Sequence, residues 1–403
     1  MSPQPAVTGL GMPKVPTGGD RWLAVGRSGD PDAKRAGAEA ARAALAGDDP
    51  RLLIVFCWDG YDLTGLLEGI AGEAGTVPVV GCSTAGEISA SGPGDSGVVI
   101  TAIGGSGFSV ATAAARVGSG GLRGASAEAA ACVATLGGGD HRVLLLLTDG
   151  LAGDQQEVVR GAYQQVGAEI PLVGGCAGDG LRMKATFQLH GTTVLDNAVV
   201  AAAIASNAPM GIGVRHGWRR VGDPMVVTSS SDNRVFTLDD RPALDAYLER
   251  LEAPEPTWSD PVAFTRFALT HPLGLNRRSG EEVRFVAEAG FEDRSLVCIA
   301  QVPQGGQAWF MEGDEDSVLA ATDAACAAAV AGLGDSAPLG LLAFDCIARR
   351  GVLGDAGIAR EVERISGFAG GAPVAGFYTY GEIARTHGMS GFHNQTLVVL
   401  ALA

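Results

Sequence analysis

The 403-residue chain is poor in aromatic residues, at 6%, and in charged residues, at 18%. With few aromatic rings available, the core must be built from Val, Leu, Ile and Ala. The hydrophobic fraction of 46% excludes a disordered chain. Glycine, in contrast, is abundant at 60 residues, which predicts many turns and close backbone approaches. The composition therefore predicts a globular protein, long enough for two or three domains.

Basic residues are also scarce. The chain has 29 Lys and Arg against 45 Asp and Glu, and its formal net charge is -16. An acidic chain repels phosphate backbones and anionic lipid. The charge therefore argues against nucleic acid and against membrane surfaces as partners.

The seven cysteines lack CxxC spacing, and several lie inside apolar runs such as 52–57. This pattern is typical of buried free thiols in a reducing compartment. Residues 1–20 lack the apolar segment of a signal peptide and are predicted to be a flexible leader. The least charged stretch, 197–214, contains Pro209 and two glycines, so we expect a strand and turn there and not a membrane span. A cytoplasmic location follows as the expectation.

Three segments share one pattern: an apolar strand, a helix-length stretch, and a Pro-led strand that ends in a Gly-rich loop. Their strands and loops cover 52–57 with 77–88, 143–148 with 170–181, and 339–346 with 372–383. Aligned without gaps, the first and third loops agree at seven of twelve positions. The second loop is a weaker relative of the other two. The chain is therefore predicted to contain a threefold repeat.

Near-continuous Val, Leu and Ile runs indicate strands that are covered on both faces, and the crossovers favour parallel pairing. The crossovers 62–74, 155–166 and 357–365 are predicted to be helical. The predicted fold class is α/β, with two domains built from repeated β-α-β units, mixed sheets and Gly-rich loops at strand ends. We place the domains at 21–220 and 221–403.

The loops and several later motifs together resemble the FIST family. VVGCSTAGEI (79–88) and LVGGCAGDG (172–180) are similar to motifs of the FIST N-terminal domain. Five segments resemble motifs of the FIST C-terminal domain: GWRRVGDPMVVT (217–228), THPLG (270–274), AFDCIAR (343–349), GFYTYGEIA (376–384) and HNQTL (393–397). The motifs occur in family order over about residues 20–403.

The resemblance implies a function that the residues alone do not. FIST domains are described as intracellular signal-transduction sensors proposed to bind small ligands such as amino acids. Some bacterial members are reported to bind haem and to sense nitric oxide. Because the two FIST halves would use the whole chain, we expect the signalling output to come from a separate protein, such as a histidine kinase.

The two Thr-x-Gly-Glu loops are the first candidate ligand site. They offer Thr84, Glu87, Thr379 and Glu382 together with free backbone N–H groups. Hydroxyls and amides suit a carboxylate and a glutamate suits an ammonium, so the mixture fits a zwitterion. The alternative is that each glutamate closes its own turn.

Four further residues are candidates for the same site. Tyr378 and Tyr380 flank Thr379 in the third loop, where core packing is the alternative role. Arg349 is a candidate carboxylate partner, or else an exposed surface arginine. Asn394 could supply an amide contact, although turn capping is its commoner use.

Two other functions remain open. An enzyme would use Cys82 or Cys176 of the glycine loops as nucleophile, although a ligand-binding sensor is favoured. Haem b needs one axial ligand and an apolar pocket, and His190, His216 and His393 lie beside strands of the repeat. No spacing typical of a metal site is present.

Overall fold

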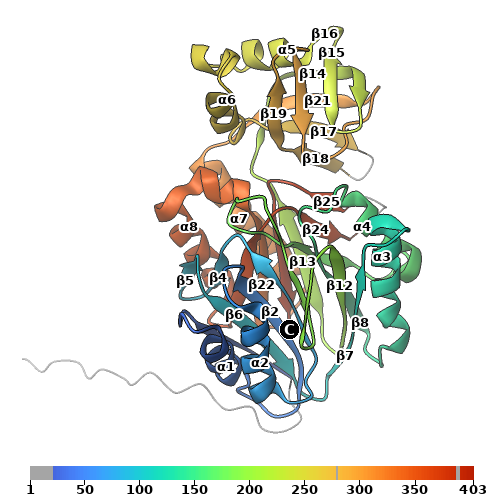
Figure 1. Cartoon of the computed structure of the whole chain (residues 1–403), viewed down its shortest axis with the longest axis vertical. Helices are drawn as coiled ribbons and strands as arrows, with labels where there is room; N and C mark the ends of the chain where they lie inside the picture. Colours follow the sequence, from blue (N-terminus) through green and yellow to red (C-terminus); the bar gives the residue numbers. More distant parts are fainter. Residues whose placement is uncertain (1–20, 278–279, 387–390) are drawn as a thin grey trace, which may run out of the picture.

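The computed structural model describes residues 21–277, 280–386 and 391–403. Within these ranges the chain forms three units of identical element order around a common centre, and a separate module is inserted into the third unit (Figure 1). Each unit runs strand, helix, strand, helix, strand, a hairpin or hairpin-like pair, and a final strand. The α/β class, the repeated β-α-β units and the mixed sheets are confirmed.

The first unit contains β1 (Trp22–Ser28), α1 (Ala33–Ala44), β2 (Pro50–Trp58), α2 (Leu63–Ala74), β3 (Val79–Thr84), β4 (Glu87–Ser89), β5 (Gly92–Gly94) and β6 (Val98–Gly104). The second contains β7 (Phe108–Arg116), α3 (Gly121–Ala130), a 3-10 turn (Ala131–Thr135), β8 (His141–Thr148), α4 (Gln156–Val166), β9 (Leu172–Cys176), β10 (Gln188–His190), β11 (Thr193–Leu195) and β12 (Ala198–Ser206).

The third unit contains β13 (Met210–Arg215), α7 (Glu315–Ala331), β22 (Gly340–Cys346), α8 (Ile347–Ala369), β23 (Val374–Thr379), β24 (Glu382–Arg385), β25 (Phe392–His393) and β26 (Leu397–Leu402). Helix α8 begins ten residues before the predicted stretch 357–365. It is two helical pieces joined at Gly354, whose φ of 61° and ψ of -179° are not helical.

The inserted module lies between β13 and α7 and stands above the rest of the molecule in Figure 1. It contains β14 (Arg219–Ser231), β15 (Arg234–Leu238), β16 (Arg241–Pro242), α5 (Ala243–Arg250), a 3-10 turn (Glu255–Trp258), α6 (Pro261–Ala268), β17 (Leu273–Arg277), β18 (Gly280–Arg284), β19 (Val286–Gly290), β20 (Ser295–Cys298) and β21 (Gln307–Glu312). Its strands form one sheet around a core of its own, which includes Tyr247, Phe264 and Phe310.

The three units exchange hairpins. Their sheets have the orders β1-β6-β2-β3-β10-β11, β7-β12-β8-β9-β24-β25 and β13-β26-β22-β23-β4-β5. In each sheet four strands come from one unit, and the last two are the hairpin of another unit. The first unit gives its hairpin to the third, the third to the second, and the second to the first. The three units therefore form a closed ring.

In each unit one glycine makes room for the close parallel pairing of two strands. β2 and β3, β8 and β9, and β22 and β23 pair in parallel, with Gly81 opposite Val55, Gly174 opposite Leu146 and Gly376 opposite Ala343. A Cβ on any of these glycines would lie 2.0–2.4 Å from the carbonyl oxygen of its partner. Only glycine fits these three equivalent positions, since real Cβ atoms do not approach so closely.

A shared core fills the centre of the ring. Phe56, Phe344 and Phe377 come from two units and contact one another, with ring centroids 4.6–6.2 Å apart. Buried Leu and Val side chains of β8, β12 and β26 complete this core. Within the described residues no helix is both long and apolar enough to cross a membrane.

Candidate functional site

The three glycine loops meet and are tied together in pairs by hydrogen bonds. The Ser83 hydroxyl donates to the Gly178 carbonyl (2.8 Å), and the Gly178 amide donates to the Ser83 carbonyl (3.0 Å). The Tyr378 amide donates to the Gly86 carbonyl at 2.8 Å, and the Cys176 amide donates to the Gly381 carbonyl at 2.8 Å. Each loop therefore contacts both of the others. The repeat brings together segments far apart in the sequence.

Two of the loops are closed by their own threonine and glutamate. The Thr84 hydroxyl donates to Glu87 Oε1 at 2.7 Å and accepts a hydrogen bond from the Gly86 amide at 3.2 Å. The third loop repeats this geometry, because the Thr379 hydroxyl donates to Glu382 Oε1 at 2.5 Å and accepts from the amide two residues later at 3.2 Å. This arrangement corresponds to the turn-closing alternative for both glutamates.

Both glutamates are also anchored to the segment that leads into the last strand of their unit. Glu87 Oε2 accepts from the Gly97 amide at 3.2 Å, and Glu382 Oε2 accepts from the Thr396 amide and hydroxyl at 3.1 and 2.7 Å. Glu87 is 2% exposed and Glu382 is fully buried. Burial raises the pKa of each carboxyl to about 7.

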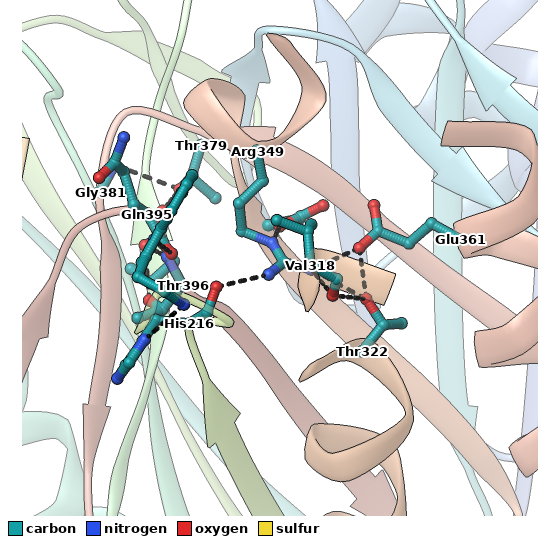
Figure 2. A network of polar contacts seen from close by, with 12 residues as sticks. His216, Val318, Thr322, Arg349, Glu361, Thr379, Gly381, Gln395 and Thr396 are labelled. Carbon is teal, nitrogen blue, oxygen red and sulfur yellow. Dashed lines mark hydrogen bonds and ion pairs between the residues drawn. The ribbon is translucent and has the colours of Figure 1, made fainter. Parts of the chain in front are cut away.

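Arg349 lies in a fully buried polar network and not on a surface (Figure 2). Its guanidinium donates to Asp345 Oδ1 at 2.6 Å and to Glu361 Oε1 at 2.6 Å. It also donates to the Thr322 hydroxyl at 2.8 Å and to the His216 carbonyl at 3.1 Å. Each of its three guanidinium nitrogens therefore donates to a group of the protein.

The remaining sequence candidates have different surroundings. Tyr378 and Asn394 are buried, at 0% and 1% exposure. The Tyr380 hydroxyl donates to Asp179 and accepts a hydrogen bond from the Leu181 amide at 2.7 Å. Among the sequence candidates, Thr84 and Tyr380 line the clefts described below, and Glu87 lines another cleft of about 490 Å³.

The thiols and imidazoles proposed for chemistry are also engaged in the fold. Cys82 and Cys176 are buried, and burial raises the pKa of Cys82 well above its ordinary value and that of Cys176 to about 12. His190 Nε2 is 3.1 Å from the Thr112 hydroxyl, His393 Nε2 is 2.9 Å from a backbone carbonyl, and His216 accepts a backbone hydrogen bond at 3.0 Å. None of these three histidines lines either cleft below.

A cleft of about 460 Å³ opens where the first and second loops meet the start of α8. We call it the loop cleft. It is lined, among others, by Trp58, Asp59, Thr84, Gly86, Asp95, Leu181, Arg182, Ile347, Arg350 and Asp355. The lining combines carboxylates, two arginines and apolar side chains, which is the mixture that a small charged metabolite requires.

Asp59 has one paired and one unpaired carboxylate oxygen in the lining of the loop cleft. Its side chain is 9% exposed, and Oδ2 forms an ion pair with Arg182. Oδ1 is buried and has no hydrogen-bond partner in the protein. An unpaired buried carboxylate oxygen is costly, so its position in the lining of a cleft points to a partner that comes from outside the protein.

The loop 180–185, which follows β9, forms one wall of the loop cleft. Asp179 holds it by accepting hydrogen bonds from the amides of Met183 (3.0 Å), Lys184 (2.7 Å) and Ala185 (3.1 Å). Burial alone would raise the pKa of Asp179, but its hydrogen bonds from Tyr380 and these amides hold the pKa below its ordinary value. Leu181 and Met183 have φ of 65° and 52°, which non-glycine residues rarely adopt. The wall is thus preorganised.

A second cleft, of about 530 Å³, lies between the ring and the inserted module. We call it the module cleft. Gln155, Met183 and Tyr380 line it from the ring, and Asn233 and Ile299 line it from the module. Within the described residues no group of three His, Cys, Asp or Glu side chains could hold a metal ion.

The residues of the loop cleft that sequence analysis missed are Asp59, Arg182 and Arg350. Asp59 lies three residues before Asp62 in the sequence CWDGYDL, and Asp62 is the N-cap position of α2. Arg182 and Arg350 each follow a recognised motif by one or two residues. The available sequence signal was a charged residue just past a motif at the end of a strand.

Comparisons with known proteins place the chain in a family. The FIST N domain matches residues 51–241 and the FIST C domain matches residues 243–385. The uncharacterized protein MJ1623 of Methanocaldococcus jannaschii is 26% identical over 153 residues, which are 36% of this chain and 30% of that protein. The chain thus spans under a third of that relative's length.

Among solved structures, a cyanuric acid hydrolase from A. caulinodans aligns with 47% of this chain and 72% of its own, at 14% identity and a TM-score of 0.28. That similarity is too low to support an argument about function. The family matches, in contrast, cover most of the chain. The chain belongs to the FIST family, whose domains are generally taken to be small-ligand-sensing domains of signal transduction.

Proposed function

We propose that this FIST protein senses a small zwitterionic metabolite of the amino-acid class, bound in the loop cleft. The observation that carries the proposal is the unpartnered, buried Oδ1 atom of Asp59. An ammonium group supplies the donors that a carboxylate oxygen needs, and a hydrogen bond between charged groups is among the stronger ones in proteins.

Arg350 is proposed to bind the ligand's carboxylate. It donates to the Ala85 carbonyl at 3.0 Å and forms an ion pair with Asp95, whose side chain is 72% exposed. An ion pair with so exposed a partner contributes little. A ligand carboxylate can therefore replace Asp95 at the guanidinium at small cost. Trp58 and Ile347 offer apolar surface to the rest of the ligand.

The direct test is calorimetric titration with the twenty proteinogenic amino acids. For any that binds, Asp59→Asn should weaken binding by about 10- to 150-fold, which corresponds to the 1.5–3 kcal/mol of a hydrogen bond to a charged group. The control is Asp140→Asn, an equal change of charge at an exposed residue outside the clefts.

The ligand's own groups provide the second arm. The amine obtained by removing the carboxylate from a bound amino acid should lose the Arg350 contact, and the acid obtained by removing its amino group should lose the Asp59 contact. Equal affinity of Asp59→Asn and wild type, or full affinity of the acid that lacks an amine, would refute the assignment. The signalling partner, a kinase or another protein, is part of the proposal that rests on the family.

A further inference from the structure

The first two turns of α8 carry adjacent arginines with different surroundings. Arg350 lines the loop cleft, whereas Arg349 is completely buried. The break at Gly354 separates the piece that contains both arginines from the rest of α8. Ile347–Leu353 is therefore a short helical piece in which Ile347, Arg350 and Gly351 line the cleft, whereas Arg349 is buried in the interior.

Arg349 connects this piece to the start of the inserted module. It is held within the ring by Asp345 at the end of β22, by Thr322 of α7 and by Glu361 of α8. Another hydrogen bond reaches the carbonyl of His216, three residues before β14 (Figure 2). The arginine therefore links the ring to the connection on which the module is mounted.

Two further contacts join the same region to the module. The Trp218 indole N–H donates to the Gln395 carbonyl at 3.0 Å, and the Gln395 amide donates to the Leu269 carbonyl at 3.0 Å. A Cβ on Gly351 would lie 3.9 Å from the Leu269 side chain, so the helical piece itself reaches the end of α6. The contacts from the helical piece and from Gln395 both converge on Leu269.

The cleft and the buried network also meet at Tyr378. The Arg350 guanidinium lies over the Tyr378 ring, 4.9 Å from its centroid. The hydroxyl of Tyr378, Asp345 Oδ2 and Glu361 Oε2 are buried without a hydrogen-bond partner. Two carboxyl groups share the Arg349 guanidinium. A small displacement of the arginine therefore weakens their hydrogen bonds, because each polar atom of the network has few neighbours.

We infer that Arg349 is a positioning residue that transmits occupancy of the loop cleft to the inserted module. The inference rests on the proposed function. A ligand that binds Arg350 displaces the Ile347–Leu353 piece, and this displacement changes the contact of Arg349 with the His216 carbonyl. The module then changes its orientation on the ring, and with it the walls of the module cleft.

The ligand-free protein provides the first test. Dyes on Glu128→Cys in α3 and Glu255→Cys in the module report their distance by energy transfer; both positions are exposed, and all seven native cysteines are buried. Arg349→Lys keeps the charge but loses the forked geometry, so the distance distribution should broaden. Arg360→Lys, an equal change on α8 at an exposed ion pair, should leave it unchanged. Thr322→Val is a milder variant in case Arg349→Lys fails to fold.

The second test adds a mixture of the twenty proteinogenic amino acids, with binding measured by calorimetry on the same samples. The wild type and Arg360→Lys should shift their distance distribution, whereas Arg349→Lys should bind and not shift. Binding with an identical shift in Arg349→Lys would overturn the inference and leave the proposed function standing. If the wild type binds none of the amino acids, the proposed function is refuted. A ligand-free distribution that neither Arg349→Lys nor Thr322→Val changes would overturn the inference regardless of binding.

Discussion

Glu382 offers the sharpest test of the loop architecture, because a buried carboxyl that closes a turn makes the stability of the protein depend on pH. In the structure the carboxyl is fully buried and closes the third loop by its bonds to Thr379 and Thr396. Burial raises its pKa from an ordinary value of 4.5 to about 7, and the hydrogen bonds only partly oppose this rise. A pKa unit corresponds to about 1.4 kcal/mol, so ionisation of Glu382 costs about 3 kcal/mol more in the folded than in the unfolded chain.

The direction of the pH dependence follows from proton binding. The folded state binds the Glu382 proton more tightly than the unfolded state does. Its contribution to stability is therefore fully present below about pH 4.5, and it is lost as the pH rises through about 7. Glu87, with a pKa also raised to about 7 by burial, should act in the same direction. We expect the free energy of unfolding to fall between about pH 5 and about pH 8.5.

Glu382→Gln removes the ionisable proton and keeps the size of the side chain. Relative to wild type, this variant should gain about 3 kcal/mol in free energy of unfolding between about pH 5 and about pH 8.5. Urea denaturation at several pH values measures this difference, and Glu128→Gln on the exposed face of α3 is the control. Parallel pH profiles of wild type and Glu382→Gln would refute the reasoning. Ligand binding in the loop cleft should change less than twofold, a difference of about 0.4 kcal/mol.

Three further predictions follow from the fold. Thiol reagents should label almost no cysteine in the native protein and all seven after denaturation without reductant, because every thiol is buried and free; recovery of three or five would contradict this. Tyr380→Phe should lower the free energy of unfolding by about 1–3 kcal/mol in urea denaturation, since it leaves Asp179 and the Leu181 amide short of a partner; an unchanged value would show that the contact contributes nothing. Gly376→Ala should lower the melting temperature severely or prevent folding, whereas Gly367→Ala, with open space around its Cβ, should be neutral or slightly stabilising; similar melting temperatures would contradict the packing argument.

The repeat was predictable from the sequence because one physical constraint recurs in each unit. Gly81, Gly174 and Gly376 occupy the position where a carbonyl of the neighbouring strand leaves no room for a Cβ. The Pro-led strands and Gly-rich loops around them are therefore preserved in the sequence. The hairpin exchange was not predictable, since β4, β10 and β24 are only three or four residues long and their partners lie in other units.

The candidate site was predicted to lie near the loops, but mostly other side chains line the cleft. Arg349 and Arg350 differ by one residue, which turns a helical side chain by about 100°. Because the sequence predicted a helix only over 357–365, no helical direction was available at Arg349. Asp59 and Arg182 meet because the loop that precedes the exchanged hairpin of the second unit lies beside the first, and a single sequence does not reveal this pairing.

The exchange of hairpins bears on how the chain folds during synthesis. The third sheet needs β4 and β5 of the first unit, and the second sheet needs β24 of the last. Ring closure therefore waits until nearly the whole chain has been made, and pairings of such sequence separation form slowly. A fragment that ends at residue 241 would leave β9 with an unpaired edge where β24 belongs. Exposed edges template association, so we expect such fragments to aggregate and to need the remaining part of the chain in order to become soluble.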